Sequence, residues 1–230
     1  MVQQHNNRLL SRLSKDDLSS LEPSLEAVEL AAHETLEQPN RRIKHAYFIE
    51  RGMASVIAQR GAEQVEIAVI GREGMTGLAI VMDTDRSPQR TVIELEGHAL
   101  RIAAPELRKA LAQSDTLRRY CLHYAHAFLI QTAHTALANA SGKLEERVAR
   151  RLLMAYDRVD GDELPITHDF IGMMLGAARP GVTLAMQELE RRGLIAQQRG
   201  RITVIDRAGL EASSGNTYGP PEAEFQRLFG

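Results

Sequence analysis

The chain has 230 residues, of which 43% are hydrophobic and 25% are charged, and its formal net charge is −2. This composition is typical of a folded globular protein with one large or two ordinary domains, and it excludes a collagen-like chain or a histone-like basic nucleic-acid binder. The single cysteine, Cys121, excludes an internal disulfide framework and any cysteine-clustered zinc or iron–sulfur site.

The N-terminal sequence MVQQHNNRLLSRLSKDD has no apolar core of the length found in signal peptides. No later stretch approaches the roughly 18 uninterrupted apolar residues of a membrane span. We therefore expect a cytoplasmic protein without membrane association.

Leucines spaced among polar residues predict a short amphipathic helix between residues 7 and 25, broken near Pro23. From residue 28 to 102 the sequence changes to short runs rich in β-branched and aromatic residues, such as AYFIE, MASVIA, VEIAVI and TVIEL. Turn-forming residues, including Arg51-Gly52, separate these runs. Short strands between turn signals predict an antiparallel sandwich or barrel.

A helix-favouring tract begins at Pro105, and nothing breaks a helix between Asp115 and Asn139. The apolar residues of this tract form two stripes: Leu122, Ala125, Leu129, Thr132 and Ala136 on one side, and Leu117, Cys121, Tyr124 and Phe128 on the other. Two stripes need two covering surfaces, which favours a helix that packs both on its own domain and on the same helix of a second copy. A helix buried within one chain is the alternative. Ala140-Ser141-Gly142 predicts a hinge after it.

The segment Leu164–Asp206 predicts two short helices, a tight turn and a hairpin. Thr167 is a suitable N-cap for the first helix, and Gly176 begins the turn because glycine adopts a positive φ easily. Pro180 lies at the start of the second helix, where its missing N–H removes no intrahelical bond. The apolar spacing leaves three residues on the outer face of this helix: Arg179, Thr183 and Gln187.

Two short helices joined by a glycine turn are typical of a helix-turn-helix, whose second helix enters the major groove of double-stranded DNA. Arg179 would then lie where a guanidinium bonds the O6 and N7 atoms of guanine. Arg199 and Arg201 lie at the tip of the hairpin, where they would follow the phosphate backbone. A helical hairpin that binds no nucleic acid is the alternative, but the order of cap, turn, Arg-led helix and Arg-tipped wing favours DNA.

On these segments the chain resembles the Crp/Fnr family of bacterial transcription regulators over nearly its full length. GAARPGVTLAMQELERRGLI and RGRITVIDRAGLE resemble the family's helix-turn-helix and wing, and YFIERGMASVIA and IGREGMTGL resemble its cyclic-nucleotide-binding-like domain. The resemblance implies an α+β fold with an N-terminal antiparallel β jelly roll, a long dimerisation helix and a C-terminal winged helix-turn-helix. It also implies a homodimer that binds a palindromic operator and contacts RNA polymerase, without enzymatic activity.

The corresponding divisions are a sensor domain at 1–114, the dimerisation helix at 115–139, the DNA-binding domain at 140–212 and a tail at 213–230. We expect the tail to be loosely ordered, because it contains Ser-Ser-Gly-Asn and Gly-Pro-Pro.

The resemblance assigns base reading to Arg179 and places Thr167 and His168 near the phosphates. Pro180 and Leu184 stand where the best-known cyclic-AMP-responsive members have a Glu and an Arg that read bases, so we expect a different operator. Gly181 either lets the backbone approach a phosphate or is an incidental small residue. The predicted DNA-binding residues are Thr167, His168, Arg179, Gly181, Thr183, Leu184, Gln187, Arg199 and Arg201.

In the family's cyclic-nucleotide binders, a Gly-Glu pair and a later Arg-Ser or Arg-Thr pair hold the ribose and the cyclic phosphate. Here Leu78 follows Gly77, so the ribose-binding carboxylate is missing, whereas Arg90-Thr91 resembles the phosphate-binding pair. A surface position is the alternative for Arg90, and Glu73 is a substitute carboxylate in a different register. The predicted effector pocket comprises Glu73, Thr76, Gly77, Arg90 and Thr91, and we expect that it does not use cyclic AMP.

No iron–sulfur cofactor is expected, because the N-terminal cysteine cluster of the oxygen-sensing branch is absent. Cys121 lies on an apolar stripe, which favours a core position over a redox sensor.

A cupin-type metalloenzyme is a rival interpretation, but only His45 and His98 lie in the strand-rich part and no His-x-His pair occurs. The long helix carries His123, His126 and His134, of which the first two have a spacing that suits a metal or haem, although a solvated face is favoured. No nucleophile elbow or P-loop occurs, so we predict no catalytic residue and no metal site. A third interpretation, a cyclic-nucleotide-binding module without DNA binding, leaves the Arg-led helix and the wing unexplained.

Overall fold

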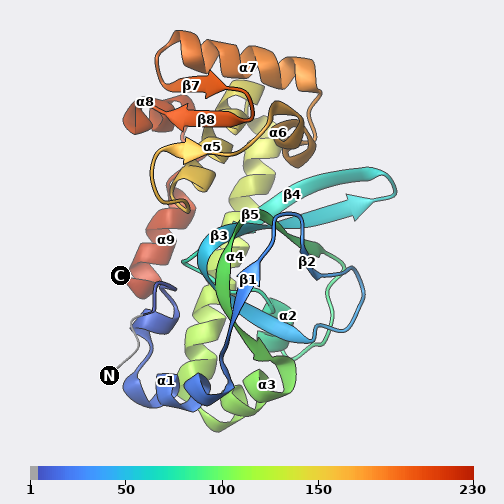
Figure 1. Ribbon diagram of the computed structural model, residues 1–230, viewed down its shortest axis with the longest axis vertical. Coiled ribbons are helices and arrows are strands. Elements are labelled where there is room, and N and C mark those ends of the chain that lie inside the picture. Colours follow the sequence, from blue (N-terminus) through green and yellow to red (C-terminus); the bar gives the residue numbers. More distant parts are fainter. Residues whose placement is uncertain (1–4) are drawn as a thin grey trace. The chain divides into compact units, whose positions relative to one another are not determined.

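The computed structural model describes residues 5–230 (Figure 1), and the chain divides into two compact units. The first unit comprises the residues up to Val56, Val69–Leu129 and Phe225–Gly230. The second unit comprises Ile57–Ala68 and Ile130–Glu224. Within the described part of the chain, no helix is both long and apolar enough to cross a membrane.

The first unit begins with short helical turns rather than one continuous helix: η1 (Leu10–Arg12), α1 (Lys15–Leu21) and η2 (Glu22–Ser24). Ser14 caps α1 by accepting a hydrogen bond from the Asp17 backbone N–H at 3.1 Å. The Asp17 carboxylate in turn accepts hydrogen bonds from the hydroxyls of Ser114 and Thr116. The predicted amphipathic segment thus contributes buried leucines to the core, and Asp17 fixes it to the start of the long helix.

The main antiparallel sheet, predicted from the alternation of strand and turn signals, lies largely in the first unit, while its hairpin at Ile57–Ala68 belongs to the second unit. Its strands are β1 (Glu26–Leu30), β2 (Thr35–Glu37), β3 (His45–Arg60), β4 (Glu63–Ile70) and β5 (Arg90–Ala103), and the short helix α2 (Leu78–Val81) lies between β4 and β5 in the chain. The strand order is β1-β5-β3-β4, with β2 also paired to β5.

Arg51-Gly52 does not end a strand, contrary to the prediction, because β3 continues through it to Arg60. Gly52 has a φ of +93°, and a Cβ atom there would lie 2.5 Å from the carbonyl oxygen of Leu95 on β5. The glycine therefore permits a close approach of two backbones within the sheet.

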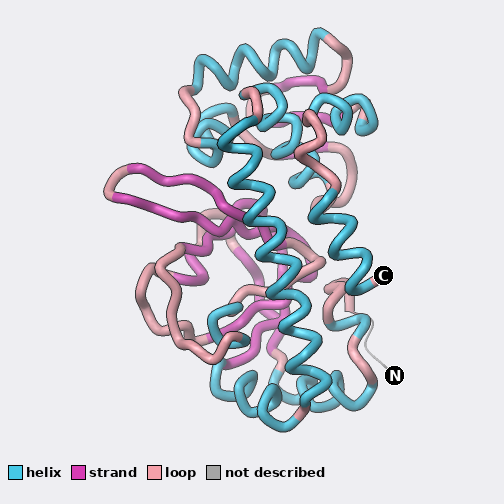
Figure 2. Tube along the Cα trace, turned by 180° about the vertical axis from the view of Figure 1, so that it is seen from behind, coloured by secondary structure: helices cyan, strands magenta, loops and turns pink. Residues whose placement is uncertain are grey.

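The helices α3 (Ala104–Gln113) and α4 (Asp115–Ser141) follow the sheet, and α4 is one uninterrupted helix (Figure 2). In the first unit, α4 buries Leu117, Cys121, Tyr124 and Ala127 in the core. Cys121 is 3% exposed, which confirms the core position, and burial raises the pKa of its thiol to about 12.

The second unit contains several helices and a small three-stranded antiparallel sheet. Its elements after α4 are α5 (Leu144–Tyr156), β6 (Glu163–Leu164), α6 (His168–Leu175), α7 (Arg179–Arg191), β7 (Ile195–Gln198), β8 (Arg201–Val204) and α8 (Arg207–Ser213). The sheet has the order β6-β8-β7. Arg151 of α5 forms a buried ion pair with Glu66 of β4, with Nε and Oε1 2.6 Å apart.

The C-terminal tail is not loosely ordered as predicted, because it ends in the helix α9 (Pro220–Phe229). Its last residues belong to the first unit, where the ring of Phe229 lies 5.1 Å from that of Tyr120 and 4.7 Å from that of Phe225. The Pro-Pro pair suggested a loop, whereas proline is well tolerated in the first turn of a helix. The spacing of Phe225 and Phe229 gives the helix one buried face.

Candidate nucleic-acid interface

The helices α6 and α7 form the predicted helix-turn-helix. Thr167 is the N-cap of α6, and its Oγ1 accepts a hydrogen bond from the Phe170 N–H at 3.2 Å. Gly176 ends α6 in the left-handed conformation with a φ of +59°. Arg179 is the first residue of α7, and Pro180 occupies its first turn. These positions confirm the local structure expected from the cap, turn and proline.

Gly172 is a second glycine on which the tight turn depends. A Cβ atom at this position would lie 2.8 Å from the carbonyl oxygen of Ala177, which is closer than real Cβ atoms approach an oxygen. The close packing of α6 against the turn therefore requires glycine at a position that helical propensity disfavours.

The outer face of α7 is accessible to a ligand. Arg179, Pro180, Leu184 and Gln187 are exposed, Gly181 and Thr183 are partly exposed, and Leu184 reaches 67% exposure. The opposite face is fixed in the core through Val182, Ala185, Met186 and Leu189. A Cβ atom at Gly181 would lie 2.9 Å from Leu144 Cδ2 of α5, a contact that a small movement of the leucine side chain would relieve, so packing does not require glycine at this position.

Arg179 already has an ion-pair partner, Asp169, which sequence reasoning missed. The Arg179 Nη1 atom lies 3.1 Å from Asp169 Oδ2, and their side chains are 67% and 64% exposed. An ion pair this exposed contributes little to stability, so a base or phosphate can displace the carboxylate. On the wing, Arg201 similarly pairs with Glu163 at 3.1 Å, whereas Arg199 lies at the exposed turn between β7 and β8.

His168 joins α6 to both α7 and the wing. Its Nδ1 lies 3.1 Å from Thr183 Oγ1, and its Nε2 lies 2.7 Å from Gln197 Oε1. The Gln197 amide nitrogen donates to Glu190 Oε2 at 2.9 Å, which leaves the amide oxygen to accept from His168 Nε2–H. In a neutral ring, Nδ1 then accepts from the Thr183 hydroxyl. The ring therefore orients Thr183 of the candidate surface and links it to Gln197 on β7.

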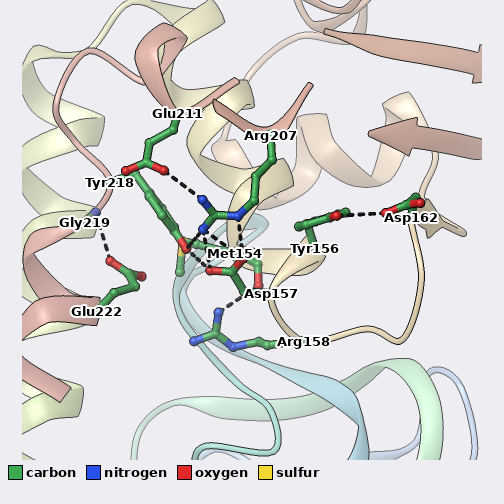
Figure 3. Close-up of polar contacts among 10 residues, drawn as sticks. All are labelled: Met154, Tyr156, Asp157, Arg158, Asp162, Arg207, Glu211, Tyr218, Gly219 and Glu222. Atoms are coloured by element: carbon green, nitrogen blue, oxygen red, sulfur yellow. Dashed lines mark hydrogen bonds and ion pairs between the residues drawn. The ribbon is translucent and has the colours of Figure 1, made fainter. Parts of the chain in front are cut away.

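A polar cluster lies at the C-terminal end of α5 (Figure 3). Asp157 accepts a hydrogen bond from the Tyr218 hydroxyl and forms an ion pair with Arg207, whose Nη2 lies 3.1 Å from Asp157 Oδ1. Arg207 also lies over the Tyr218 ring, with its Cζ 5.8 Å from the centroid. Burial is the main cause that raises the pKa of Tyr218. These contacts join α5, the start of α8 and the segment before α9, and so have a structural role.

The predicted effector residues separate into two groups. Thr76, Gly77 and Thr91 converge on the carboxyl group of Glu37, a residue that sequence reasoning did not identify. Glu73 instead accepts a hydrogen bond from the backbone N–H of Gly71 at 3.2 Å, and Arg90 is a partly exposed residue at the start of β5.

The histidines considered for a metal site do not meet at one point. Among residues 5–230, no group of three or more His, Cys, Asp or Glu residues has an arrangement that could hold a metal ion. His45 lies near Tyr47 in β3, where burial, assisted by the charge of Arg101, lowers its pKa.

Comparison with known proteins agrees with this geometry. The family model of the Crp-like helix-turn-helix domain matches residues 146–213. The transcriptional regulator LdrP of Thermus thermophilus is 27% identical over 201 residues, which cover 81% of this chain and 95% of that protein. The family model describes a helix-turn-helix domain and the relative is a transcription regulator, so neither match is to an enzyme.

Solved structures share the fold. FixK2 from Bradyrhizobium japonicum has a TM-score of 0.71 at 16% identity, covering 82% of this chain and 96% of its own. A CRP/FNR-family regulator from Thermus thermophilus has a TM-score of 0.60 at 21% identity, with 84% and 100% covered. A DNA-binding transcription regulator is therefore the class that the fold and the α6–α7 surface define. The chain contains a Crp-like helix-turn-helix domain, is similar over most of its length to a transcription regulator, and shares its fold with a solved CRP/FNR-family regulator.

Proposed function

We propose that the chain binds a palindromic DNA operator as a homodimer, with α7 in the major groove and the β7–β8 wing along the phosphate backbone. The observation that carries this proposal is the exposed face of α7, which begins with Arg179 and is held by His168 at Thr183. The proposed functional divisions are the sensor at 1–114, the dimerisation helix at 115–139 and the DNA-binding domain at 140–212. Such a regulator acts in the cytoplasm and contacts RNA polymerase.

The exposed face of α4 supports a dimer. Leu122, Leu129 and Leu137 are 43%, 62% and 55% exposed. Several large apolar side chains exposed along one helix are typical of an interaction surface. A two-fold axis through this face would bury the leucines of each copy against those of the other. It would also place two copies of α7 so that they read two half-sites.

The sensor is proposed not to respond to cyclic AMP. Leu78, which stands where the family's nucleotide binders have a carboxylate, is partly buried and packs against the apolar core of the first unit. Burial of an aliphatic side chain there leaves no charged group from this position to bond a ribose hydroxyl.

The test is selection from a randomised duplex pool, followed by titration of the selected duplex at a stated salt concentration with the wild type, Arg179→Ala and Arg191→Ala. Arg191 is a matched control, because it lies at the opposite end of α7, is exposed and pairs with Glu188. We expect the wild type to select a palindrome. Arg179→Ala should lose about 1–3 kcal/mol of preference at one guanine in each half-site, because one bidentate contact is removed.

Arg191→Ala should keep the base preference of the wild type. Equal base preference in wild type and Arg179→Ala would contradict the assignment of α7 as the recognition helix. Binding without any base preference, in the presence and absence of cell extract, would contradict the operator proposal.

A further inference from the structure

In the first unit, several hydrogen-bond donors converge on one buried carboxyl group. Glu37, at the end of β2, is 9% exposed. Its Oε1 accepts from the Gly77 backbone N–H at 2.6 Å, and its Oε2 accepts from the Thr91 hydroxyl at 3.0 Å. The Thr76 hydroxyl makes a further hydrogen bond to the same carboxyl group. One backbone N–H and two hydroxyls thus meet at one buried group.

A shift in strand register brings Glu37 to this position. Thr35 lies opposite Val92 in the β2–β5 pair, and an unbroken antiparallel register would place Glu37 opposite Arg90. The register shifts by one residue instead, so that Glu37 lies opposite Thr91. Because of this irregularity, the residue opposite Glu37 is the buried Thr91 and not the partly exposed Arg90.

The donors themselves are held by the sheet. Thr76 exchanges hydrogen bonds with Tyr47 of β3, donating its N–H to the Tyr47 carbonyl at 3.0 Å and accepting the Tyr47 N–H on its hydroxyl oxygen at 3.1 Å. Gly77 has a φ of +80°, and a Cβ atom there would lie 2.7 Å from the Ala46 Cβ. Only glycine fits this turn, so the position of its N–H is set by the backbone rather than by a mobile side chain.

We propose that Glu37 is a built-in occupant of an anion-binding cradle formed by Gly77, Thr76 and Thr91. The carboxylate fills the place that a small external carboxylate or phosphate would otherwise take, and the first unit reaches its folded state without such a ligand. It follows, resting on the proposed function, that DNA binding requires no anionic effector at this cradle.

The chemistry of the cradle suits an anion. Hydrogen bonds to a carboxylate are stronger than those between neutral groups, and donors left without an acceptor in a buried site are costly. Burial raises the pKa of Glu37, and the hydrogen bonds from Gly77, Thr91 and Thr76 oppose that rise. Removal of the carboxyl group would leave the same donors facing a space of matching size.

The experiment is chemical rescue of Glu37→Ala, followed by thermal unfolding monitored by circular dichroism. The probes are sodium acetate, sodium formate and inorganic phosphate, with sodium chloride at equal ionic strength and neutral acetamide as references. Glu29→Ala is the matched control, because Glu29 is an exposed glutamate on β1 of the same sheet. Glu37→Gln tests the occupant in its uncharged form at similar volume.

We expect Glu37→Ala to have a lower Tm than the wild type and to recover by about 3–6 °C when acetate or formate reaches about ten times its Kd. Acetate and formate should not raise the Tm of the wild type, Glu29→Ala or Glu37→Gln. The cradle is filled by Glu37 in the first two chains and by the glutamine side chain in the third. Equal responses to acetamide and acetate would overturn the proposal, and so would an equal rise of Tm in the wild type.

A Glu37→Ala chain that stays unfolded at the highest acetate and formate concentrations would also count against it. Because unfolding is followed without DNA, these results do not depend on whether the operator proposal holds.

Discussion

At the scale of single residues, His168 holds the candidate DNA-binding surface together. Its two ring nitrogens contact Thr183 on α7 and Gln197 on β7, which come from different sides of the helix-turn-helix. The family resemblance predicts that His168 lies near the phosphates, but the sequence does not reveal these two partners, which lie 15 and 29 residues away. A positioning role follows from the geometry.

A double-mutant cycle tests this role. His168→Ala should weaken operator binding and also destabilise the second unit, because Thr183 and Gln197 each lose a hydrogen-bond partner. Thr183→Val keeps the side-chain shape and removes only the hydroxyl. We expect the free energies of unfolding of the two single variants and the double variant to give a coupling of about 0.5–3 kcal/mol.

Additive effects of the two substitutions on stability would contradict a direct His168–Thr183 bond. A loss of DNA affinity in His168→Ala with unchanged stability would indicate a phosphate contact instead.

At the scale of elements, α4 was predicted from an unbroken run of helix-forming residues, and its two stripes largely correspond to a buried and an exposed face. Leu117, Cys121 and Tyr124 are buried, while Leu122 and Leu129 are exposed. Periodicity is a strong signal in a long helix because its apolar positions repeat many times. The exposed face of α4 therefore predicts where two copies of the chain contact each other.

Leu129→Glu should convert a dimer into a monomer, because the two-fold axis would bring two buried carboxylates close together. Met82→Glu is the matched control, since Met82 is also an exposed apolar residue, at 57%, but lies outside α4. Sedimentation velocity at a fixed protein concentration distinguishes the two states. A dimer that survives Leu129→Glu would exclude this face of α4 as the interface.

Other elements could not be predicted, for identifiable physical reasons. Gly52 was interpreted as a turn, because a sequence cannot distinguish a glycine that reverses the chain from one that allows two strands to approach. Glu37 and the Arg151–Glu66 ion pair depend on partners 40 to 85 residues away. The helix-turn-helix was predictable because its cap, turn glycine and proline act within a few residues of each other.

For the whole molecule, the proposed operator and the proposed dimer share one two-fold symmetry. One copy of α7 can contact one half-site, and neutralisation of phosphates by one wing gives only modest affinity. Two copies joined through α4 would bind a palindrome with the affinity of both half-sites, because the second contact becomes intramolecular. The palindrome and the dimer therefore depend on each other.

The most direct test of this claim is to titrate the wild type against the selected palindromic duplex and against the same duplex with one half-site scrambled, at equal salt. We expect two chains bound per palindrome and a large loss of affinity for the scrambled duplex, at least tenfold, or about 1.4 kcal/mol. Equal affinity for both duplexes, with one chain bound to each, would contradict it.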